Sequence, residues 1–440
     1  MDKNISEYLN NDYLSSSMYI LYRSTPSYID GLKNSTRKLV YTLKKKNIKE
    51  ETKVSALGGF VTSEAGYLHG DTSIQGAIVT TAQDYCGSNN LPIITPNGNF
   101  GTRMINEASS ARYIFTKPQP YFYEIFKKED DGNLIKQNFE GDEIEPRYYV
   151  PTLPLVLING SSGIGVGFAT KILNRDTKNI IKALKNKLNR VRINSKYFYP
   201  QWNGFKGTVI DLGNNKWQIK GIANLKSKRK VEILELPINY NLSSYIDVLK
   251  KLKEKNIIDS YDDYSENDIF RFEVQLTQEE SNKDFDTIFE DLKLSTVITE
   301  SLCCIDENNS IIEFNSVQDI FNKYYDVKID YMNKRIKSEI LRLTEEKNTL
   351  KEIIDFINEV INGTINLKDS NDKLTKSMTD KGYKNIDKLL SMPFKSLTKE
   401  KVKELKDKYK TKSDELANMQ KETAESLWLK DIEQLEEKIA

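Results

Sequence analysis

The last third of the chain carries apolar side chains that recur every seven residues, and a second apolar stripe follows further along. These positions are Ile329, Ile336, Leu343, Leu350 and Ile357, then Val402, Leu405, Tyr409, Leu416 and Met419. A sustained seven-residue repeat is typical of helices that pack along a coiled-coil seam. The pattern predicts two long antiparallel helices within 319–440, separated by a small globule near 362–397. Thr398 is the expected N-cap of the returning helix.

Nearer the N-terminus the apolar spacing changes to that of a single amphipathic helix. Leu32, Leu39, Val40 and Leu43 share one face of this predicted helix, and Lys33, Arg37 and Lys44 share another. Asp30-Gly31 supplies a turn before it. We expect residues 1–140 to form a compact helix-rich region with a basic face turned toward phosphates.

The middle of the chain is predicted to be mixed. Tyr148–Ile158 is apolar and rich in strand-forming residues, which predicts a buried strand, and it leads into a glycine-rich loop, 159–167. Between 200 and 320, strand-like segments at 207–210, 217–219, 231–234 and 270–274 alternate with helical ones such as Ser244–Lys255. The fold class that these patterns predict is α+β and multidomain, with a long coiled-coil arm.

The overall composition adds little to this picture, but the distribution of charged residues along the chain is informative. Lys plus Arg number 65 and Asp plus Glu 64, so bulk charge gives no argument for nucleic-acid binding. Between Arg23 and Lys53, however, nine basic residues face three acidic ones, which fits either a phosphate-binding stripe or a solvated helix face. Three sparse cysteines and the lack of a signal peptide or an apolar run of membrane length predict an intracellular, reduced location and no membrane partner.

Candidate chemistry comes from one histidine and one Arg-Tyr pair. His69 is the only histidine beside 24 tyrosines, and it is suited to donate a hydrogen bond or to act as an acid or base near neutral pH. Arg112-Tyr113 follows a glycine bend. A phenol with a reference pKa of ~10 needs help to attack a phosphodiester, and a neighbouring guanidinium supplies it. For an isolated Arg-Tyr pair, a packed aromatic is the commoner explanation, and Tyr148 in the second pair, Arg147-Tyr148, fits that explanation.

The glycine loop does not match a phosphate-binding motif. Gly163-x-Gly165 is followed by Phe168 where a dinucleotide fingerprint needs a small residue, and no Gly-Lys-Ser/Thr appears. A tight turn is the simple interpretation. Ile164 between glycines is nevertheless poorly covered by neighbours, and some DNA-bending proteins insert such apolar wedges between base steps.

Several motifs follow one another in order along nearly the whole chain. They are Arg23-Ser-Thr-Pro-Ser-Tyr-Ile-Asp-Gly-Leu-Lys33 with Arg37-Lys38, Tyr67-Leu-His-Gly-Asp71, Asn97-Gly-Asn-Phe-Gly-Thr102, Ala108-Ser-Ser-Ala-Arg-Tyr113, Val150-Pro-Thr-Leu-Pro154, Asn159–Gly167, Leu389–Lys401 and Ser426-Leu-Trp428. In this order they resemble the DNA-cleavage subunit of type IIA DNA topoisomerases. Individual segments look closer to the eukaryotic and T-even phage branch than to bacterial gyrase.

The resemblance implies a role for each matching residue. Tyr113 would be the nucleophile that forms a 5′-phosphotyrosyl link, with Arg112, Arg23 and His69 assisting at the scissile phosphate. Lys33, Arg37 and Lys38 would bind the DNA backbone, and Ile164 would be the bending wedge. It also implies an N-terminal arm (1–20), a winged-helix domain (21–145), an α/β tower domain (146–318) and a coiled coil (319–440) whose globular tip near 362–397 forms a homodimer contact.

The resemblance further implies a partner. This family needs an ATPase domain and an acidic Mg²⁺-binding Toprim domain, and neither a phosphate loop nor an Asp-x-Asp site in the right context occurs here. We therefore expect double-stranded DNA as substrate and a separate ATPase/Toprim subunit that holds Mg²⁺ and ATP in a heterotetramer. The T-even phage enzyme has this arrangement.

Two other functions fit parts of the sequence. A tyrosine recombinase also uses Arg, His and Tyr, but it usually shows His-x-x-Arg, whereas His69 is followed by Gly-Asp-Thr72. A non-catalytic DNA-bending or bridging coiled-coil protein would keep the basic helix, the wedge and the arm. The Tyr113 hydroxyl distinguishes this DNA-bending protein from a topoisomerase, because only the topoisomerase needs the hydroxyl.

Overall fold

The computed structural model describes residues 4–393, 395 and 397–439. The chain divides into two compact units: a large unit of Met1–Lys328 with Leu429–Ala440, and a small unit of Ile329–Trp428. Within the described residues, no helix is both long and apolar enough to cross a membrane.

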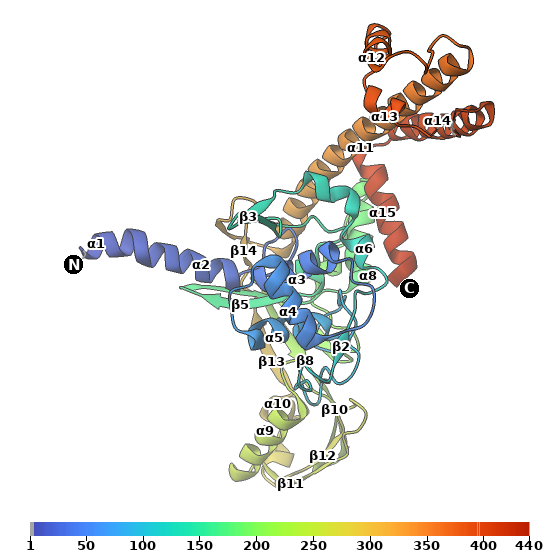
Figure 1. Cartoon of the computed structure of the whole chain (residues 1–440). Helices are drawn as coiled ribbons and strands as arrows, with labels where there is room; N and C mark the ends of the chain where they lie inside the picture. The colour runs from blue at the N-terminus through green and yellow to red at the C-terminus, as the bar shows by residue number, and fades with distance from the viewer. Residues whose placement is uncertain (1–3, 394, 396, 440) are drawn as a thin grey trace. The chain divides into compact units, whose positions relative to one another are not determined.

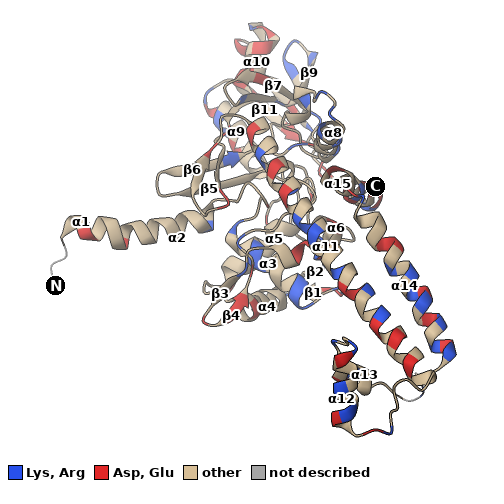
Figure 2. Ribbon diagram, turned by 90° about the horizontal axis from the view of Figure 1, so that it is seen from above, with Lys and Arg blue, Asp and Glu red and all other residues tan. Residues whose placement is uncertain are grey.

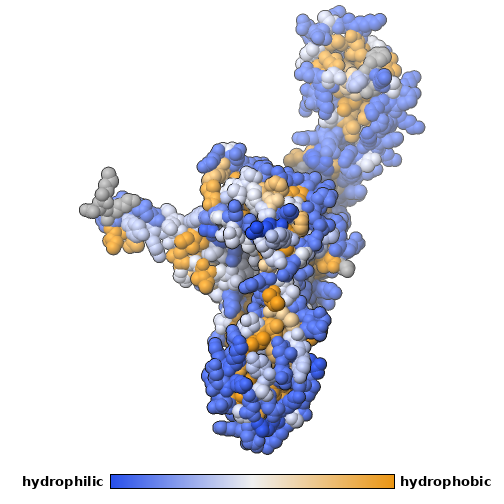
Figure 3. Space-filling model, turned by 60° about the horizontal axis from the view of Figure 1, so that its bottom comes forward, coloured by the Kyte–Doolittle hydropathy of each residue, from blue (hydrophilic) through white to orange (hydrophobic). Residues whose placement is uncertain are grey.

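The large unit begins with a helical segment that extends away from the helices that follow it (Figure 1). It comprises α1 (Ile5–Glu7), the π-helical turn η1 (Tyr8–Tyr13) and α2 (Leu14–Ser24). Only Ser17 and Leu21 of α2 are buried, and apolar side chains gather along the exposed surface of this segment (Figure 3). The first three residues of the expected 1–20 arm lie outside the described residues.

Three helices build the core of the N-terminal region: α3 (Asn34–Lys45), α4 (Val54–Ala65) and α5 (Asp71–Ala82). The predicted apolar face of α3 is confirmed, because Leu39, Val40 and Leu43 are fully buried. Gly31 precedes this helix with φ +68°, and a Cβ there would lie 2.4 Å from the backbone nitrogen of Val156. The chain can therefore make this turn only with glycine.

Short elements close this region. Strands β1 (Thr52–Lys53) and β2 (Phe115–Thr116) pair antiparallel, as do β3 (Gln137–Phe139) and β4 (Asp142–Ile144). Between them lie α6 (Phe122–Ile125) and the 3₁₀ turn η2 (Lys128–Asn133).

The predicted strand over Tyr148–Ile158 is wrong. Its residues are buried as expected, but Leu155–Ile158 form a short helix, α7. Pro151 and Pro154 lack the N–H that a sheet ladder requires, and Pro154 instead stands at the N-cap of α7. The strands come later, in a hairpin of β5 (Ser161–Gly165) and β6 (Phe168–Ile172).

The region that follows is mixed, as predicted. After α8 (Thr177–Leu188) and the 3₁₀ turn η3 (Ser195–Phe198), one antiparallel sheet has the order β13-β8-β7 and another the order β11-β12-β10-β9. The strands are β7 (Thr208–Gly213), β8 (Lys216–Lys220), β9 (Ile222–Ser227), β10 (Lys230–Glu235), β11 (Ile258–Asp263), β12 (Phe272–Leu276) and β13 (Ser295–Thr299). The predicted strands at 207–210, 217–219, 231–234 and 270–274 are confirmed, with ends that differ by at most three residues. The predicted helix is α9 (Leu242–Glu254), which packs on the four-stranded sheet with α10 (Phe285–Asp291).

Buried polar residues link this region internally. Arg175 and Glu300 are fully buried and form a bidentate ion pair, 2.6 Å between Nη2 and Oε2. The 3₁₀ turn η4 (Glu280–Asn282) lies between β12 and α10, and the antiparallel pair β14 (Cys303–Ile305) and β15 (Ile311–Glu313) follows β13. All three cysteines are free thiols.

The heptad segments are helical, as predicted. The helix α11 (Val317–Ile361) runs from the large unit into the small one, and α14 (Lys399–Met419) and α15 (Ala424–Ile439) return. Lys and Arg alternate with Asp and Glu along the exposed sides of α11 and α14 (Figure 2). Thr398 caps α14 as expected, since its side chain accepts from the N–H of Lys401. The return is broken between α14 and α15, however, so the second stripe is not one continuous helix.

The globule at 362–397 contains α12 (Asn371–Asp380) and α13 (Ile386–Leu390). Its core joins Ile365, Leu374, Met378 and Leu389 to Phe356 and Ile357 of α11. Phe394 and Ser396 of the Leu389–Lys401 motif lie outside the described residues.

Candidate functional site

Tyr113 stands on a short loop that is fixed on both sides. The carbonyls of Ala111 and Ile114 accept hydrogen bonds from the N–H groups of Ser55 (3.1 Å) and Val54 (3.0 Å) at the start of α4. The N–H of Tyr113 itself donates to the carbonyl of Ser110 at 2.9 Å. Ile114 is buried, whereas the Tyr113 side chain is 69% exposed. Tyr113 is therefore not a packed aromatic residue, because its ring lies outside the core while the backbone of its loop is held by hydrogen bonds.

Arg112 accompanies this ring. Its guanidinium carbon lies 5.6 Å from the centre of the Tyr113 ring, within cation–π range. Its Nε donates to Ser110 Oγ at 3.3 Å. The guanidinium thus keeps most of its donors available beside the phenol.

The preceding glycine bend supports the same loop. Asn97 exchanges two backbone hydrogen bonds with Phe115, at 3.0 and 2.9 Å. Gly98 and Gly101 both have positive φ, and a Cβ on Gly98 would press on Ile114 at 3.0 Å. The Asn97–Thr102 motif therefore lies directly against the Tyr113 loop.

His69 and Arg23 form a second cluster. His69 lies in the turn between α4 and α5, which Gly66 opens in the left-handed conformation. Its Nε2 is 2.5 Å from the hydroxyl of Tyr19, and Arg23, one turn further along α2, places its guanidinium 5.8 Å from the Tyr19 ring centre. The buried Tyr67 meets the imidazole edge-on at 5.3 Å. Burial, then the charges of Arg23 and Lys38, lower the pKa of His69.

The structure thus brings Arg23 to His69 and Arg112 to Tyr113. Among the contacts of the described residues, none joins the first pair to the second. Sequence reasoning missed Tyr19, which has no motif of its own and lies 50 residues from His69.

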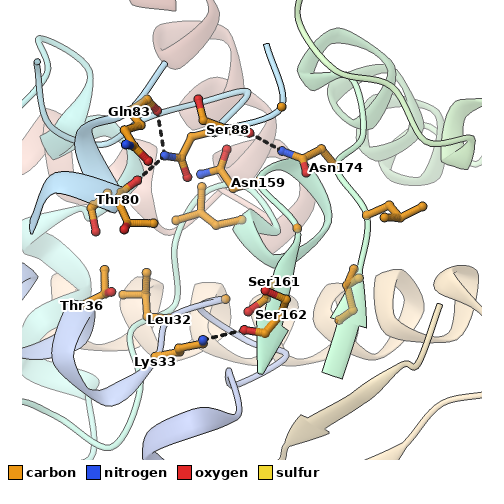
Figure 4. A pocket seen from close by; sticks show the side chains of 18 of the residues that line it. Leu32, Lys33, Thr36, Thr80, Gln83, Ser88, Asn159, Ser161, Ser162 and Asn174 are labelled. Atoms are coloured by element: carbon orange, nitrogen blue, oxygen red, sulfur yellow. Dashed lines mark hydrogen bonds between the residues drawn. The ribbon is translucent and has the colours of Figure 1, made fainter. Parts of the chain in front are cut away.

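Lys33 lines a cavity of about 590 Å³ that has both polar and apolar walls (Figure 4). Its Nζ donates to the carbonyl of Ser162 on β5 at 2.6 Å. Asn159, Asn174 and Gln83 line the same cavity with Thr36 of α3. Burial lowers the pKa of Lys33, and no acidic side chain is paired with it in the described residues. Lys33 is thus a cation that has donors left for a phosphate.

Arg37 and Lys38 do not face outward, which corrects the expectation that they contact the DNA backbone. The Arg37 side chain is 3% exposed and donates to both oxygens of Asp30, at 2.8 and 3.1 Å. Lys38 is 10% exposed and pairs with Glu145 at 2.8 Å. Lys44 is likewise paired, with Asp131. The predicted basic face of α3 is therefore largely a row of internal ion pairs.

Ile164 is 86% exposed on the β5–β6 hairpin. The glycines on either side explain why. A Cβ on Gly163 would lie 2.1 Å from the carbonyl oxygen of Ser24, and one on Gly165 would lie 2.5 Å from Ser24 Oγ. Both glycines seat the strand against the end of α2, and alternation along the strand turns Ile164 to solvent.

Comparison with known proteins places this arrangement in a family. The family model for the A subunit of DNA gyrase/topoisomerase IV matches residues 23–433. The chain belongs to this family. The chain is also similar to a mitochondrial DNA topoisomerase 2 of Dictyostelium discoideum (33% identity, 98% of this chain, 35% of the relative) and to a DNA topoisomerase 2 of Plasmodium falciparum (31%, 100% and 34%).

A solved structure of a family member has the same fold. The crystal structure of the Plasmodium falciparum topoisomerase II DNA-binding, cleavage and re-ligation domain superposes with a TM-score of 0.89 at 32% identity, over 98% of this chain and 64% of that one. The mixed helix and strand content predicted from the sequence agrees with this fold. The chain spans about a third of the length of the curated relatives it matches.

Proposed function

We propose that this chain is the DNA breakage–reunion part of an ATP-dependent type II DNA topoisomerase, with Tyr113 as nucleophile. The observation that carries the proposal is the exposed Tyr113 on a fixed loop beside Arg112, within a chain that matches the gyrase/topoisomerase IV family over residues 23–433. An exposed aromatic held by backbone hydrogen bonds has no packing role to explain it.

The proposed reaction is a transesterification. The Tyr113 oxygen attacks a backbone phosphorus, the new Tyr O–P bond forms, and the P–O3′ bond breaks. The 3′ oxygen takes up a proton, and the 5′ end stays attached to the protein. One phosphodiester replaces another, so the step is nearly isoenergetic and the released 3′-hydroxyl reverses it. Arg112, beside the phenol, offsets the negative charge that develops on the phosphate.

Arg23 and His69 are proposed to assist at the same phosphate. The described contacts hold the two together but apart from Tyr113, so DNA or a second copy of the chain must complete the site. Two copies are required in any case, since each tyrosine cuts one strand. The dimer therefore has two-fold symmetry, and we assign its contact to the tip near 362–397.

For DNA binding, Lys33 and Ile164 remain proposed contacts, and Arg37 and Lys38 become supports of α3. The cavity beside Lys33 offers amide and hydroxyl groups that suit phosphate oxygens. Ile164, exposed on the β5–β6 hairpin, is suited to enter a base step and bend the duplex. The boundaries 21–145, 146–318 and 319–440 are kept as the proposed winged-helix, tower and coiled-coil regions.

The described side chains form no preformed cluster of metal ligands. Mg²⁺ prefers several oxygen ligands, and no group of three or more His, Cys, Asp or Glu in the described residues can hold a metal. We propose that a separate ATPase/Toprim subunit binds Mg²⁺ and ATP. The T-even phage arrangement, with the cleavage part as its own chain, is the proposed assembly.

The proposal is tested by mixing this chain with its candidate ATPase/Toprim partner, Mg²⁺, ATP and supercoiled plasmid. Double-strand passage changes the linking number in steps of two. Steps of one, or no change in topology, would contradict it.

A non-catalytic DNA-bending protein remains the second candidate. The exposed Ile164 and the cavity beside Lys33 would serve such a protein as well, but they do not favour it over the breakage–reunion function. In that case DNA is bent but its topology is unchanged, and Tyr113→Phe behaves as the wild type.

A further inference from the structure

We propose that Tyr19 is a positioning residue for His69: its phenol donates a hydrogen bond to Nε2 and thereby holds the imidazole in the tautomer that carries its proton on Nδ1. The role at the phosphate rests on the proposed function, but the tautomer assignment does not. Tyr19 lies on α2 and His69 in the α4–α5 turn, and the two atoms are 2.5 Å apart.

The charges around the imidazole favour its neutral form. Arg23 of α2 and Lys38 of α3 act on it from two elements, and the phenols of Tyr19 and Tyr67 are its aromatic neighbours. Lys38 is itself paired with Glu145. Together with burial, the two cations lower the pKa of His69, so a neutral ring is expected at neutral pH.

A neutral imidazole has one N–H donor and one lone pair, so the hydrogen bond fixes which nitrogen holds the proton. Arg23 lies 5.8 Å from the Tyr19 ring centre, and its charge disfavours a second cation on the neighbouring imidazole. Within the described part of the chain, the Tyr19 hydroxyl has no other hydrogen-bond partner. When the Tyr19 O–H donates to Nε2, the lone pair of the neutral imidazole is on Nε2, and its proton is therefore on Nδ1.

Ring orientation follows from the same contacts. Tyr19 holds one edge of the imidazole, and the buried Tyr67 packs against it edge-on at 5.3 Å. His69 would then present Nδ1–H to a phosphate oxygen as a neutral donor, while Arg23 supplies the charge. This differs from a role in which an imidazolium gives up its proton.

The unique histidine permits a direct test. Untagged protein with ¹³C,¹⁵N-labelled histidine in a deuterated background gives one imidazole signal, and its Cδ2 and ring-nitrogen shifts report the tautomer. We expect Nδ1–H in the wild type at pH 8. In Tyr19→Phe we expect a shift toward Nε2–H, the form that free histidine prefers, and a raised His69 pKa, because the donor that stabilises the neutral ring is gone. Tyr13→Phe, also an exposed tyrosine of the N-terminal helix, should match the wild type.

A wild-type ring with its proton on Nε2, or identical spectra in Tyr19→Phe and Tyr13→Phe, would overturn the assignment. With the partner and DNA present, Tyr19→Phe should lower covalent complex formation by on the order of fivefold, as expected for one lost hydrogen bond. The tautomer shift without any change in cleavage would overturn the positioning role. A failure of the proposed function looks different: Tyr113→Phe would then match the wild type whatever the histidine spectrum shows.

Discussion

Lys33 Nζ donates to the carbonyl oxygen of Ser162 at 2.6 Å, which ties the residue before α3 to the hairpin that bears Ile164. The ammonium group has three donors, and this bond uses one. The same side chain can thus hold the hairpin and still meet a phosphate in the adjoining cavity.

Replacing Lys33 should weaken DNA binding through the loss of one phosphate contact. Lys33→Ala is expected to lower the slope of log K against log salt by about 0.9, the release of one counterion. Lys250→Ala, on the exposed side of α9, is the matched control and should leave the slope unchanged. Fluorescence anisotropy with a labelled duplex over a salt series measures both. Equal slopes for the two variants would remove Lys33 from the interface.

Arg37 should behave in the opposite way. Its guanidinium is buried on Asp30, and that ion pair raises its pKa despite burial. Arg37→Ala leaves the Asp30 carboxylate buried without its partner, which costs about 3–5 kcal/mol of folding free energy. Urea denaturation should therefore show a lower midpoint. A folded Arg37→Ala protein of normal stability with a reduced salt slope would restore the direct DNA contact that the sequence suggested.

Ile164→Ala should affect DNA shape and leave folding intact. The side chain is 86% exposed, so its loss should change stability by less than about 0.5 kcal/mol. Bending, measured by energy transfer between dyes at the ends of a short duplex, should decrease because the wedge is gone. Ile269→Ala, another exposed isoleucine, should bend DNA as the wild type does. An unchanged bend in Ile164→Ala would exclude the wedge.

How much the sequence revealed depended on the range of the interactions. Helices α11 and α14 and the apolar face of α3 were predictable because periodicity is local. The pairing of Arg37 and Lys38 was not, since Glu145 lies 107 residues from Lys38 and a helical pattern cannot distinguish a buried cation from a solvated one. The strand over 148–158 was predicted from the strand-forming residue types, but Pro151 and Pro154 have no N–H for a sheet ladder, and a short helix forms instead. The role of Tyr113, by contrast, was predicted from its motif and stays a prediction, and only the structure shows how its loop is held.

The small unit should lose stability in acid near its tip. Burial opposes ionisation of Glu352, but hydrogen bonds from the Asn385 side chain and from the N–H groups of Lys384 and Asn385 outweigh it and lower its pKa. A lowered pKa contributes stability above the unfolded value of about 4.3, and that stability is lost as pH falls through the folded value. The protection of the 381–392 amides, which is their exchange rate relative to the intrinsic rate at the same pH, should therefore fall in acid. Glu352→Gln should show lower protection at neutral pH and a weaker dependence of protection on pH, whereas Glu345→Gln, on the exposed side of α11, should match the wild type. Parallel pH profiles for the wild type and Glu352→Gln would contradict this.

The central claim is that Tyr113 becomes covalently attached to DNA. Its most direct test mixes the chain with its candidate ATPase/Toprim partner, Mg²⁺ and supercoiled plasmid, quenches with detergent, and maps the nucleotide-bearing peptide by mass spectrometry. We predict linear DNA with protein on its 5′ ends through Tyr113, lost in Tyr113→Phe and kept in Tyr264→Phe, which alters another exposed tyrosine. DNA that is bound but never cleaved, with Tyr113→Phe indistinguishable from the wild type, would contradict the account.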